Sequence, residues 1–132
     1  GCIIGNSTKI AGEVTIHDYA MLSACVLVHQ FSNIGSYVMI QGGSRLNKDI
    51  PPYIIVGREP ARYSGLNIIG LRRRGFSNET IKSIHEAYRE IYESGTIVST
   101  AVARIKEKGN ITPEVEYILN FIEKVSERGI IG

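Results

Sequence analysis

The sequence contains no tryptophan, only two cysteines and only three histidines in 132 residues. Cys2 and Cys25 form neither a metal-ligand spacing nor a disulfide framework, so we expect two reduced thiols in a cytoplasmic protein. No apolar run approaches the roughly 18 residues of a membrane span, so we expect no membrane insertion. A net charge of +2 is too small to favour nucleic acid as a partner, and the only dense basic cluster is Arg72, Arg73 and Arg74.

What the sequence does contain is a repeat of six residues. An aliphatic residue recurs at eight consecutive positions with this spacing: Ile4, Ile10, Ile16, Leu22, Val28, Ile34, Ile40 and Leu46. Four residues after each comes a small or β-branched residue: Thr8, Val14, Ala20, Val26, Ser32, Val38, Ser44 and Ile50. A period of six fits neither a helix nor an isolated strand, whose periods are 3.6 and 2.

The repeat predicts a parallel β-helix. Each hexad forms one short strand and one corner, the aliphatic residue points inward, and three hexads close one coil. Coils of hexapeptide-repeat proteins wind left-handed, against the usual right-handed crossover rule. Because the first residue already lies in the pattern and is not Met, we expect a fragment whose first coils lie upstream.

After Pro51-Pro52 the pattern changes, because proline cannot donate to a further ladder. Residues 53–75 indicate an extended connector that has room for one strand. Residues 76–132 predict three amphipathic helices: one capped by Ser77, one near Ser99 to Lys108, and one capped by Thr112 that ends at Gly129. The predicted fold is therefore a left-handed β-helix over residues 1–52, a connector, and a small α-helical carboxyl-terminal domain.

Three segments carry a resemblance to a known family: Val28-His29-Gln30-Phe31, Pro51-Pro52-Tyr53, and GLRRRGF at residues 70–76. With the repeat, they resemble the carboxyl-terminal part of the bacterial UDP-N-acetylglucosamine O-acyltransferase family over nearly the whole chain. The resemblance implies a homotrimer without metal or cofactor. It implies transfer of an (R)-3-hydroxyacyl group from acyl carrier protein to the 3-hydroxyl of UDP-N-acetylglucosamine, the first step of lipid A synthesis.

The resemblance also assigns catalytic positions. The family's general-base histidine should lie just upstream of Gly1, so this chain alone is expected to be inactive. Gly12 falls where the family uses a backbone N–H as oxyanion donor, and a glycine permits close backbone approach. Glu13 stands where the family often has a second histidine, which puts that auxiliary role in doubt.

Substrate positions follow in the same way. His29 and Gln30 fall on residues that line the sugar-nucleotide site. Asn67, Arg73 and Arg74 fall on groups that hold the nucleotide phosphates, a role that suits the planar fork of arginine. Gly42 falls at the position that measures acyl length, where glycine leaves the groove open for a long chain.

Each assignment has a plainer alternative. His29 could be a wall histidine, Gly12 a corner glycine, and the three arginines a solvated corner that pairs with Glu79. His17 and His85 have no partner spacing and are interpreted as surface histidines.

Two other functions stay open, and a third is disfavoured. The chain could be a non-catalytic nucleotide-binding or trimerisation module, or part of another hexapeptide acyltransferase. The carbonic anhydrase variant of the fold needs three zinc-binding histidines, whereas the repeat contains only His17 and His29.

Overall fold

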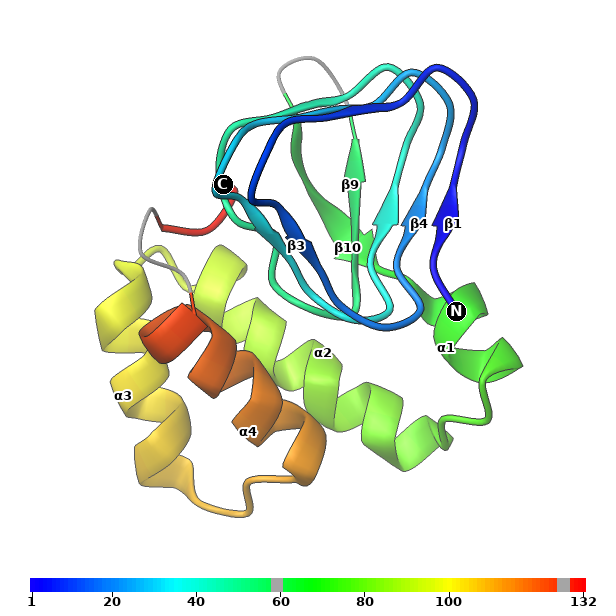
Figure 1. The fold of residues 1–132 in the computed structure, drawn as a ribbon. Coiled ribbons are helices and arrows are strands. Elements are labelled where there is room, and N and C mark those ends of the chain that lie inside the picture. The colour runs from blue at the N-terminus through cyan, green and yellow to red at the C-terminus, as the bar shows by residue number, and fades with distance from the viewer. Residues whose placement is uncertain (58–60, 126–128) are drawn as a thin grey trace.

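The computed structural model describes residues 1–57, 61–125 and 129–132, and it opens with eight strands of two residues each. They are β1 (Ile3–Ile4), β2 (Lys9–Ile10), β3 (Thr15–Ile16), β4 (Met21–Leu22), β5 (Leu27–Val28), β6 (Asn33–Ile34), β7 (Met39–Ile40) and β8 (Arg45–Leu46). Strands β1 to β5 each pair in parallel with the strand three hexads later, as Ile4 does with Leu22 and Leu22 with Ile40. The strands form the three faces of a left-handed parallel β-helix (Figure 1), which confirms the predicted fold class.

The corners turn at the third residue after each inward aliphatic. These residues have left-handed backbone conformations, with φ between 57° and 65° at Ser7, Glu13, Tyr19, Cys25, Phe31 and Tyr37. Non-glycine residues rarely adopt this conformation, and it persists where surrounding structure holds it. In the second coil, the N–H of the turning residue donates to a carbonyl of the preceding coil at two corners, from Cys25 to Asn6 at 2.9 Å and from Tyr37 to Asp18 at 3.0 Å.

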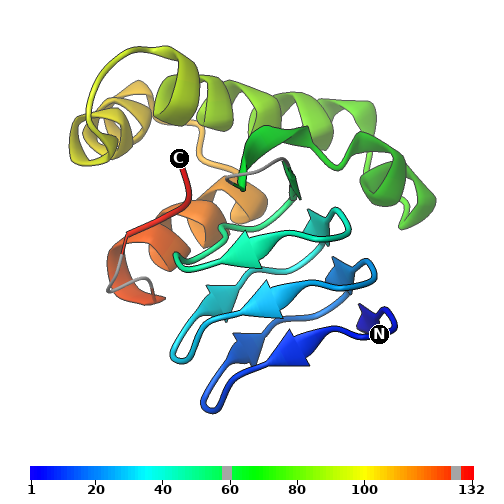
Figure 2. The same cartoon turned by 90° about the horizontal axis from the view of Figure 1, so that it is seen from above.

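The interior of the β-helix is filled by the predicted aliphatic residues. Leu22, Ile34, Ile40 and Leu46 are fully buried, together with Val26, Val38 and Ile50 from the small or β-branched series. In the first coil, by contrast, Ile4 is 49% and Ile10 39% exposed. Stacking of the coils, whose backbones lie one on the next in Figure 2, therefore produces most of the burial.

Residues 53–75 contain more regular structure than the expected connector. They form β9 (Ile54–Gly57), β10 (Arg62–Leu66) and helix α1 (Ile68–Arg73). Strand β9 pairs in parallel with β7 and antiparallel with β10, so the sheet continues past the last hexad. Ile54 and Val56 are fully buried, which gives β9 the alternation of a strand with one inward face.

The remaining elements are helices α2 (Asn78–Glu93), α3 (Val98–Lys108) and α4 (Pro113–Asn120), followed by a π-helical segment η1 (Phe121–Val125). Ser77 accepts from the N–H of Thr80 and Thr112 from that of Val115, which confirms both predicted N-caps. The expected end of the last helix at Gly129 follows residues 126–128, which lie outside the described part. No helix in the described ranges is long and apolar enough to cross a membrane.

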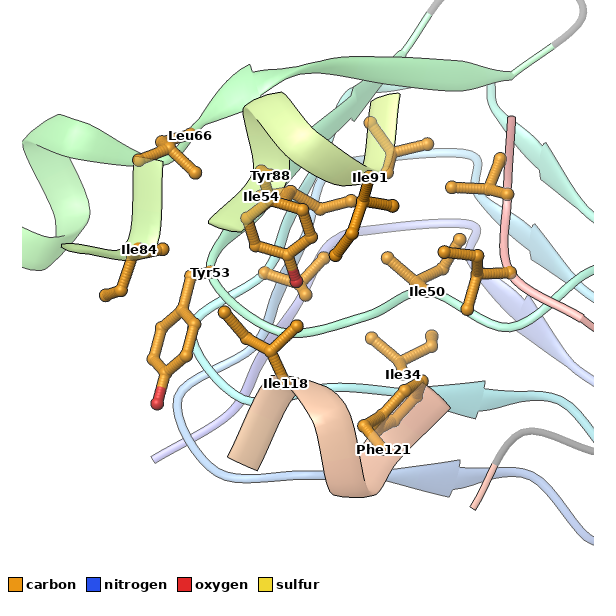
Figure 3. Packing of buried hydrophobic residues seen from close by; sticks show 14 of the residues in the cluster. Ile34, Ile50, Tyr53, Ile54, Leu66, Ile84, Tyr88, Ile91, Ile118 and Phe121 are labelled. Carbon is orange, nitrogen blue, oxygen red and sulfur yellow. The ribbon is translucent and has the colours of Figure 1, made fainter. Parts of the chain in front are cut away.

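The helices share one core with the β-helix. Figure 3 shows Tyr88, Ile118 and Phe121 of the helical part packed near Ile34 and Ile50 of the coils. The fully buried Tyr88 hydroxyl donates to the carbonyl of Pro52 at 2.5 Å. This bond joins α2 to the end of the repeat.

Candidate functional site

A pocket of about 290 Å³ lies where the corners after β3 and β6 meet helix α1. Tyr19 and Tyr37 line it from the β-helix, and Asn67, Arg73 and Arg74 line it from α1 and its two ends. The structure thus brings together the three residues that the resemblance assigns to the phosphates. Neither tyrosine was singled out from the sequence, although both occupy the same hexad position in successive coils.

The two tyrosines belong to an aromatic column along one corner of the prism. The ring centroids of Tyr19 and Tyr37 are 5.1 Å apart and those of Tyr37 and Tyr53 are 5.8 Å apart, both pairs stacked. Phe76, just after α1, meets Tyr37 edge-on at 4.9 Å. Burial raises the pKa of Tyr37, and the neighbouring Tyr19 adds to the effect, so Tyr37 is neutral at physiological pH.

Arg73 and Arg74 place two cations at this pocket. Both are exposed, and the guanidinium carbon of Arg74 lies 4.3 Å from the ring centroid of Tyr19. Within the described ranges neither arginine forms an ion pair with Glu79, the partner that the plainer alternative required. The two guanidinium groups are therefore available for an anion.

Asn67 has a structural role whatever it binds. Its side-chain Oδ1 accepts from the N–H of Gly70 at 3.3 Å, which caps α1, and its Nδ2 donates to the carbonyl of Tyr37 at 3.0 Å. A β-carbon at Gly70 would lie only 2.4 Å from Nδ2 of Asn67, so the glycine makes room for this cap. Asn67 fixes α1, and with it both arginines, against the β-helix.

His29, Gln30 and Gly12 lie at a different corner, between the faces of β2-β5-β8 and β3-β6. His29 and Gln30 are exposed, and the side chain of His29 makes no hydrogen bond to the described part of the chain. Nothing lies within 4 Å of a β-carbon built on Gly12. The fold of this chain therefore does not itself require glycine there.

Gly42 lies at the third corner, between β7 and β8. A β-carbon there would sit 3.1 Å from the carbonyl oxygen of Ala24, a tighter contact than most β-carbons make. Glycine at this position thus has a packing reason within the chain. The predicted site residues consequently occupy three separate corners of the triangular coil, and one chain does not bring them together (Figure 1).

His17 differs from its interpretation as a surface histidine. It is half-buried beneath α4 and η1, with ring centroids 6.4 Å from Tyr117 and 6.0 Å from Phe121. Its Nε2 atom is buried and has no hydrogen-bond partner among the residues that the structure describes. His85, by contrast, is exposed on α2, as expected.

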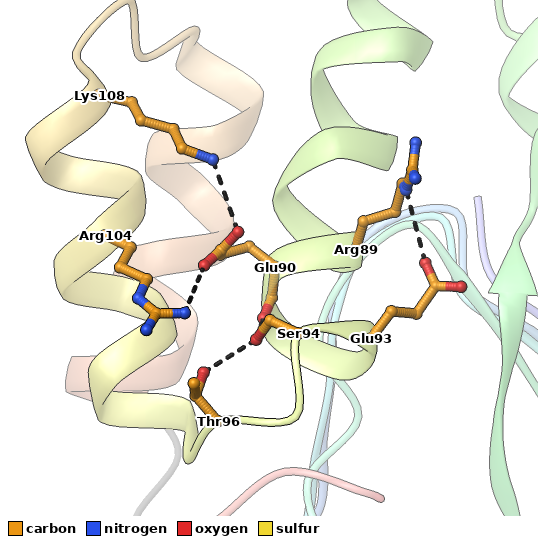
Figure 4. Close-up of polar contacts among 7 residues, drawn as sticks. All are labelled: Arg89, Glu90, Glu93, Ser94, Thr96, Arg104 and Lys108. Atoms are coloured by element: carbon orange, nitrogen blue, oxygen red, sulfur yellow. Dashed lines mark hydrogen bonds and ion pairs between the residues drawn. The ribbon is translucent and has the colours of Figure 1, made fainter.

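A second pocket, of about 410 Å³, lies between α2, α3 and the start of α4. Of its charged lining residues, Glu90 forms an ion pair with Lys108 at 3.5 Å, and Glu90 also contacts Arg104 beside the pocket at 3.4 Å (Figure 4). None of the predicted site residues lines it. In the described ranges, no three His, Cys, Asp or Glu side chains gather to hold a metal ion.

Comparison with known proteins places the chain in a family. The family model for UDP-N-acetylglucosamine O-acyltransferase, domain 2, matches residues 49–131. A curated acyl-[acyl-carrier-protein]–UDP-N-acetylglucosamine O-acyltransferase from Pseudomonas aeruginosa is 40% identical over 129 residues, which are 98% of this chain and 50% of the relative.

Two crystal structures agree with this match. A UDP-N-acetylglucosamine acyltransferase from Bacteroides fragilis is 63% identical with a TM-score of 0.97, covering 100% of this chain and 51% of that one. The enzyme from Francisella novicida is 36% identical with a TM-score of 0.92, covering 98% of this chain and 48% of that one. This chain thus spans about half the length of these relatives. It belongs to the UDP-N-acetylglucosamine O-acyltransferase family.

Proposed function

We propose that this chain supplies the nucleotide-binding part of an acyltransferase. The enzyme transfers an (R)-3-hydroxyacyl group from acyl carrier protein to the 3-hydroxyl of UDP-N-acetylglucosamine, the first step of lipid A synthesis. The observation that carries the proposal is the pocket at which Asn67, Arg73 and Arg74 converge in a chain of this family. The relatives' names support both substrates, since they name acyl carrier protein and UDP-N-acetylglucosamine.

In this proposal the pocket holds the pyrophosphate. A pyrophosphate presents several anionic oxygens, and each planar guanidinium can donate two parallel hydrogen bonds to such oxygens. Arg73 and Arg74 are consecutive and exposed, so both can face one ligand without first breaking an internal ion pair. Asn67 contributes by fixing α1 and keeps one amide hydrogen for a ligand.

The chemistry requires groups at the other corner. The sugar 3-hydroxyl attacks the thioester carbonyl carbon while a base takes its proton, and the tetrahedral intermediate then expels the carrier thiol. The exposed backbone N–H of Gly12 is our candidate donor to the oxyanion, and His29 and Gln30 are candidates for contacts with the sugar nucleotide. The general-base histidine lies outside this chain in our proposal.

The proposal includes a homotrimer. The phosphate pocket and the corner of Gly12 and His29 lie on different edges of one prism. Packing prisms side by side around an axis sets one edge of a subunit against another edge of its neighbour, so an active site can form between chains.

The proposal also includes a cytoplasmic location. Two exposed free cysteines support it, because thiols stay reduced in that compartment.

An acyl-transfer assay tests the proposal. The intact protein, supplied with (R)-3-hydroxyacyl carrier protein and UDP-N-acetylglucosamine, is expected to form the 3-O-acylated nucleotide sugar. The isolated 132-residue chain is expected to bind the nucleotide weakly and to transfer nothing. If the intact protein binds UDP-N-acetylglucosamine but transfers no acyl chain of any length, the chain is a nucleotide-binding module instead.

A further inference from the structure

Tyr19 and Arg74 form a contact that distinguishes the two arginines of the pocket. The guanidinium carbon of Arg74 lies 4.3 Å from the centre of the Tyr19 ring, within the range of a cation–π interaction. Arg73 lines the same pocket but makes no such ring contact among the described residues. One cation thus has a protein contact before any ligand arrives, whereas its neighbour is exposed to solvent without such a contact in the described part of the chain.

We propose that Tyr19 is a positioning residue that orients Arg74 toward the phosphates of the nucleotide. This inference rests on the proposed function, because it needs Arg74 to contact those phosphates. A guanidinium stacked on a ring keeps its N–H groups directed outward in its own plane, where they can donate to phosphate oxygens. Holding the group in place also reduces the side-chain entropy that binding would otherwise cost.

The aromatic column supports the ring of Tyr19. This ring stacks on that of Tyr37 at 5.1 Å, and Tyr19 turns the corner with φ 60°. The backbone of Arg74 is fixed as well, since its N–H donates to the carbonyls of Gly70 at 3.2 Å and Leu71 at 3.1 Å. Both partners are therefore anchored, and the ring contact fixes the one flexible part between them.

Docking of α1 does not depend on Tyr19 alone. Asn67 ties the start of the helix to Tyr37, and Phe76 packs beyond its end against Tyr37 and Tyr53. Removal of the Tyr19 ring is therefore expected to loosen the guanidinium and to leave the helix in place. This separation makes the positioning role measurable.

The test compares Tyr19→Leu, Tyr19→Phe and Arg74→Ala in the intact protein, with UDP-N-acetylglucosamine binding measured by calorimetry. Tyr19→Leu removes the ring and is expected to weaken binding about three- to tenfold, whereas Tyr19→Phe keeps the ring and is expected to bind like the parent. In kinetics, Tyr19→Leu should raise KM for the nucleotide sugar at unchanged kcat, because the phosphates do not react. Adding Tyr19→Leu to Arg74→Ala should weaken binding no further.

The outcomes separate the two proposals. If Arg74→Ala leaves nucleotide binding unchanged, the assignment of the phosphates to this residue fails, and the role of Tyr19 fails with it. If Arg74→Ala weakens binding but Tyr19→Leu has no effect, only the positioning role is overturned. The same holds if Tyr19→Leu weakens binding equally with Arg74 present and with Arg74 replaced by alanine. Thermal melting checks that each variant folds, and Tyr19→Met replaces Tyr19→Leu if the latter does not.

Discussion

Two buried tyrosines should make this chain sensitive to alkali. Tyr53 is 4% exposed and Tyr88 fully buried, and burial is the main cause that raises the pKa of both phenols above the ordinary value. Glu114 raises the pKa of Tyr53 further, and Tyr92 that of Tyr88. Both phenols stay neutral in the folded chain at a pH where the unfolded chain ionises them.

The sign and size of the effect follow from linkage. Below about pH 10 both states are neutral at these positions, so the full stability is present. As pH rises above about 10, each phenol that ionises only on unfolding lowers the free energy of unfolding by about 1.4 kcal/mol per pH unit. The two together remove about 3 kcal/mol per pH unit, which would exhaust a typical stability of about 5–15 kcal/mol within a few units.

Tyr88→Phe gives the decisive comparison. At pH 7 the variant loses the hydrogen bond to Pro52 and should be about 1 kcal/mol less stable. Above about pH 10 the variant also lacks the Tyr88 phenol, whose ionisation on unfolding lowers the free energy of unfolding of the parent. The two free energies should therefore be equal near pH 11, and the variant should be the more stable at higher pH. Urea unfolding at a series of pH values measures both curves, and the lack of tryptophan leaves tyrosinate absorbance as a clean second signal. Parallel curves would show that Tyr88 does not resist ionisation.

Three further predictions concern the proposed site and the glycines of the coils. Arg73→Ala should weaken UDP-N-acetylglucosamine binding about tenfold by the loss of charge-assisted hydrogen bonds, with Arg72→Ala, outside the pocket, as the matched control. Gly35→Ala should lower the free energy of unfolding by about 1–3 kcal/mol, because its β-carbon would lie 2.5 Å from the backbone of Pro52. Gly12→Ala, by contrast, should leave the melting temperature unchanged and lower only acyl transfer, because nothing lies within 4 Å of a β-carbon there. Gly42→Met should shift the preferred acyl chain to a shorter length, measured by competition between hydroxyacyl carrier proteins; an unchanged preference would remove Gly42 from the acyl groove.

The sequence was sufficient for the β-helix because one period determined strand spacing, stacking and the inward face. Leu22 and Ile40 had to meet once three hexads closed a coil, and the structure pairs them. The backbone conformation at the corners was not predictable in the same way. Tyr19 and Tyr37 have no intrinsic preference for positive φ, and hydrogen bonds between coils hold corners of this kind, as from Tyr37 to Asp18.

Elements that depend on distant contacts were predicted only in part: the connector was expected to have room for one strand, whereas it contains β9, β10 and α1. Strand β9 forms because it pairs with the free edge of β7. The sequence of residues 54–57 alone is compatible with either a paired strand or an unpaired extended segment. His17 is covered by Tyr117 and Phe121, which lie far away in the sequence. Tyr19 was missed for a different reason: its recurrence with Tyr37 was visible, but the arrangement of α1 that brings Arg74 onto its ring was not.

The separation of corners allows a direct test of how the proposed active site is assembled. If the phosphate pocket of one subunit meets the corner of His29 on its neighbour, the two halves of a site come from different chains. Intact protein with Arg73→Ala and intact protein with His29→Ala should each transfer acyl groups poorly. Mixed trimers made by co-expression should regain activity, because some sites then combine an unchanged pocket with an unchanged His29. A site built within one chain would gain nothing from mixing, since every chain would still carry one damaged half.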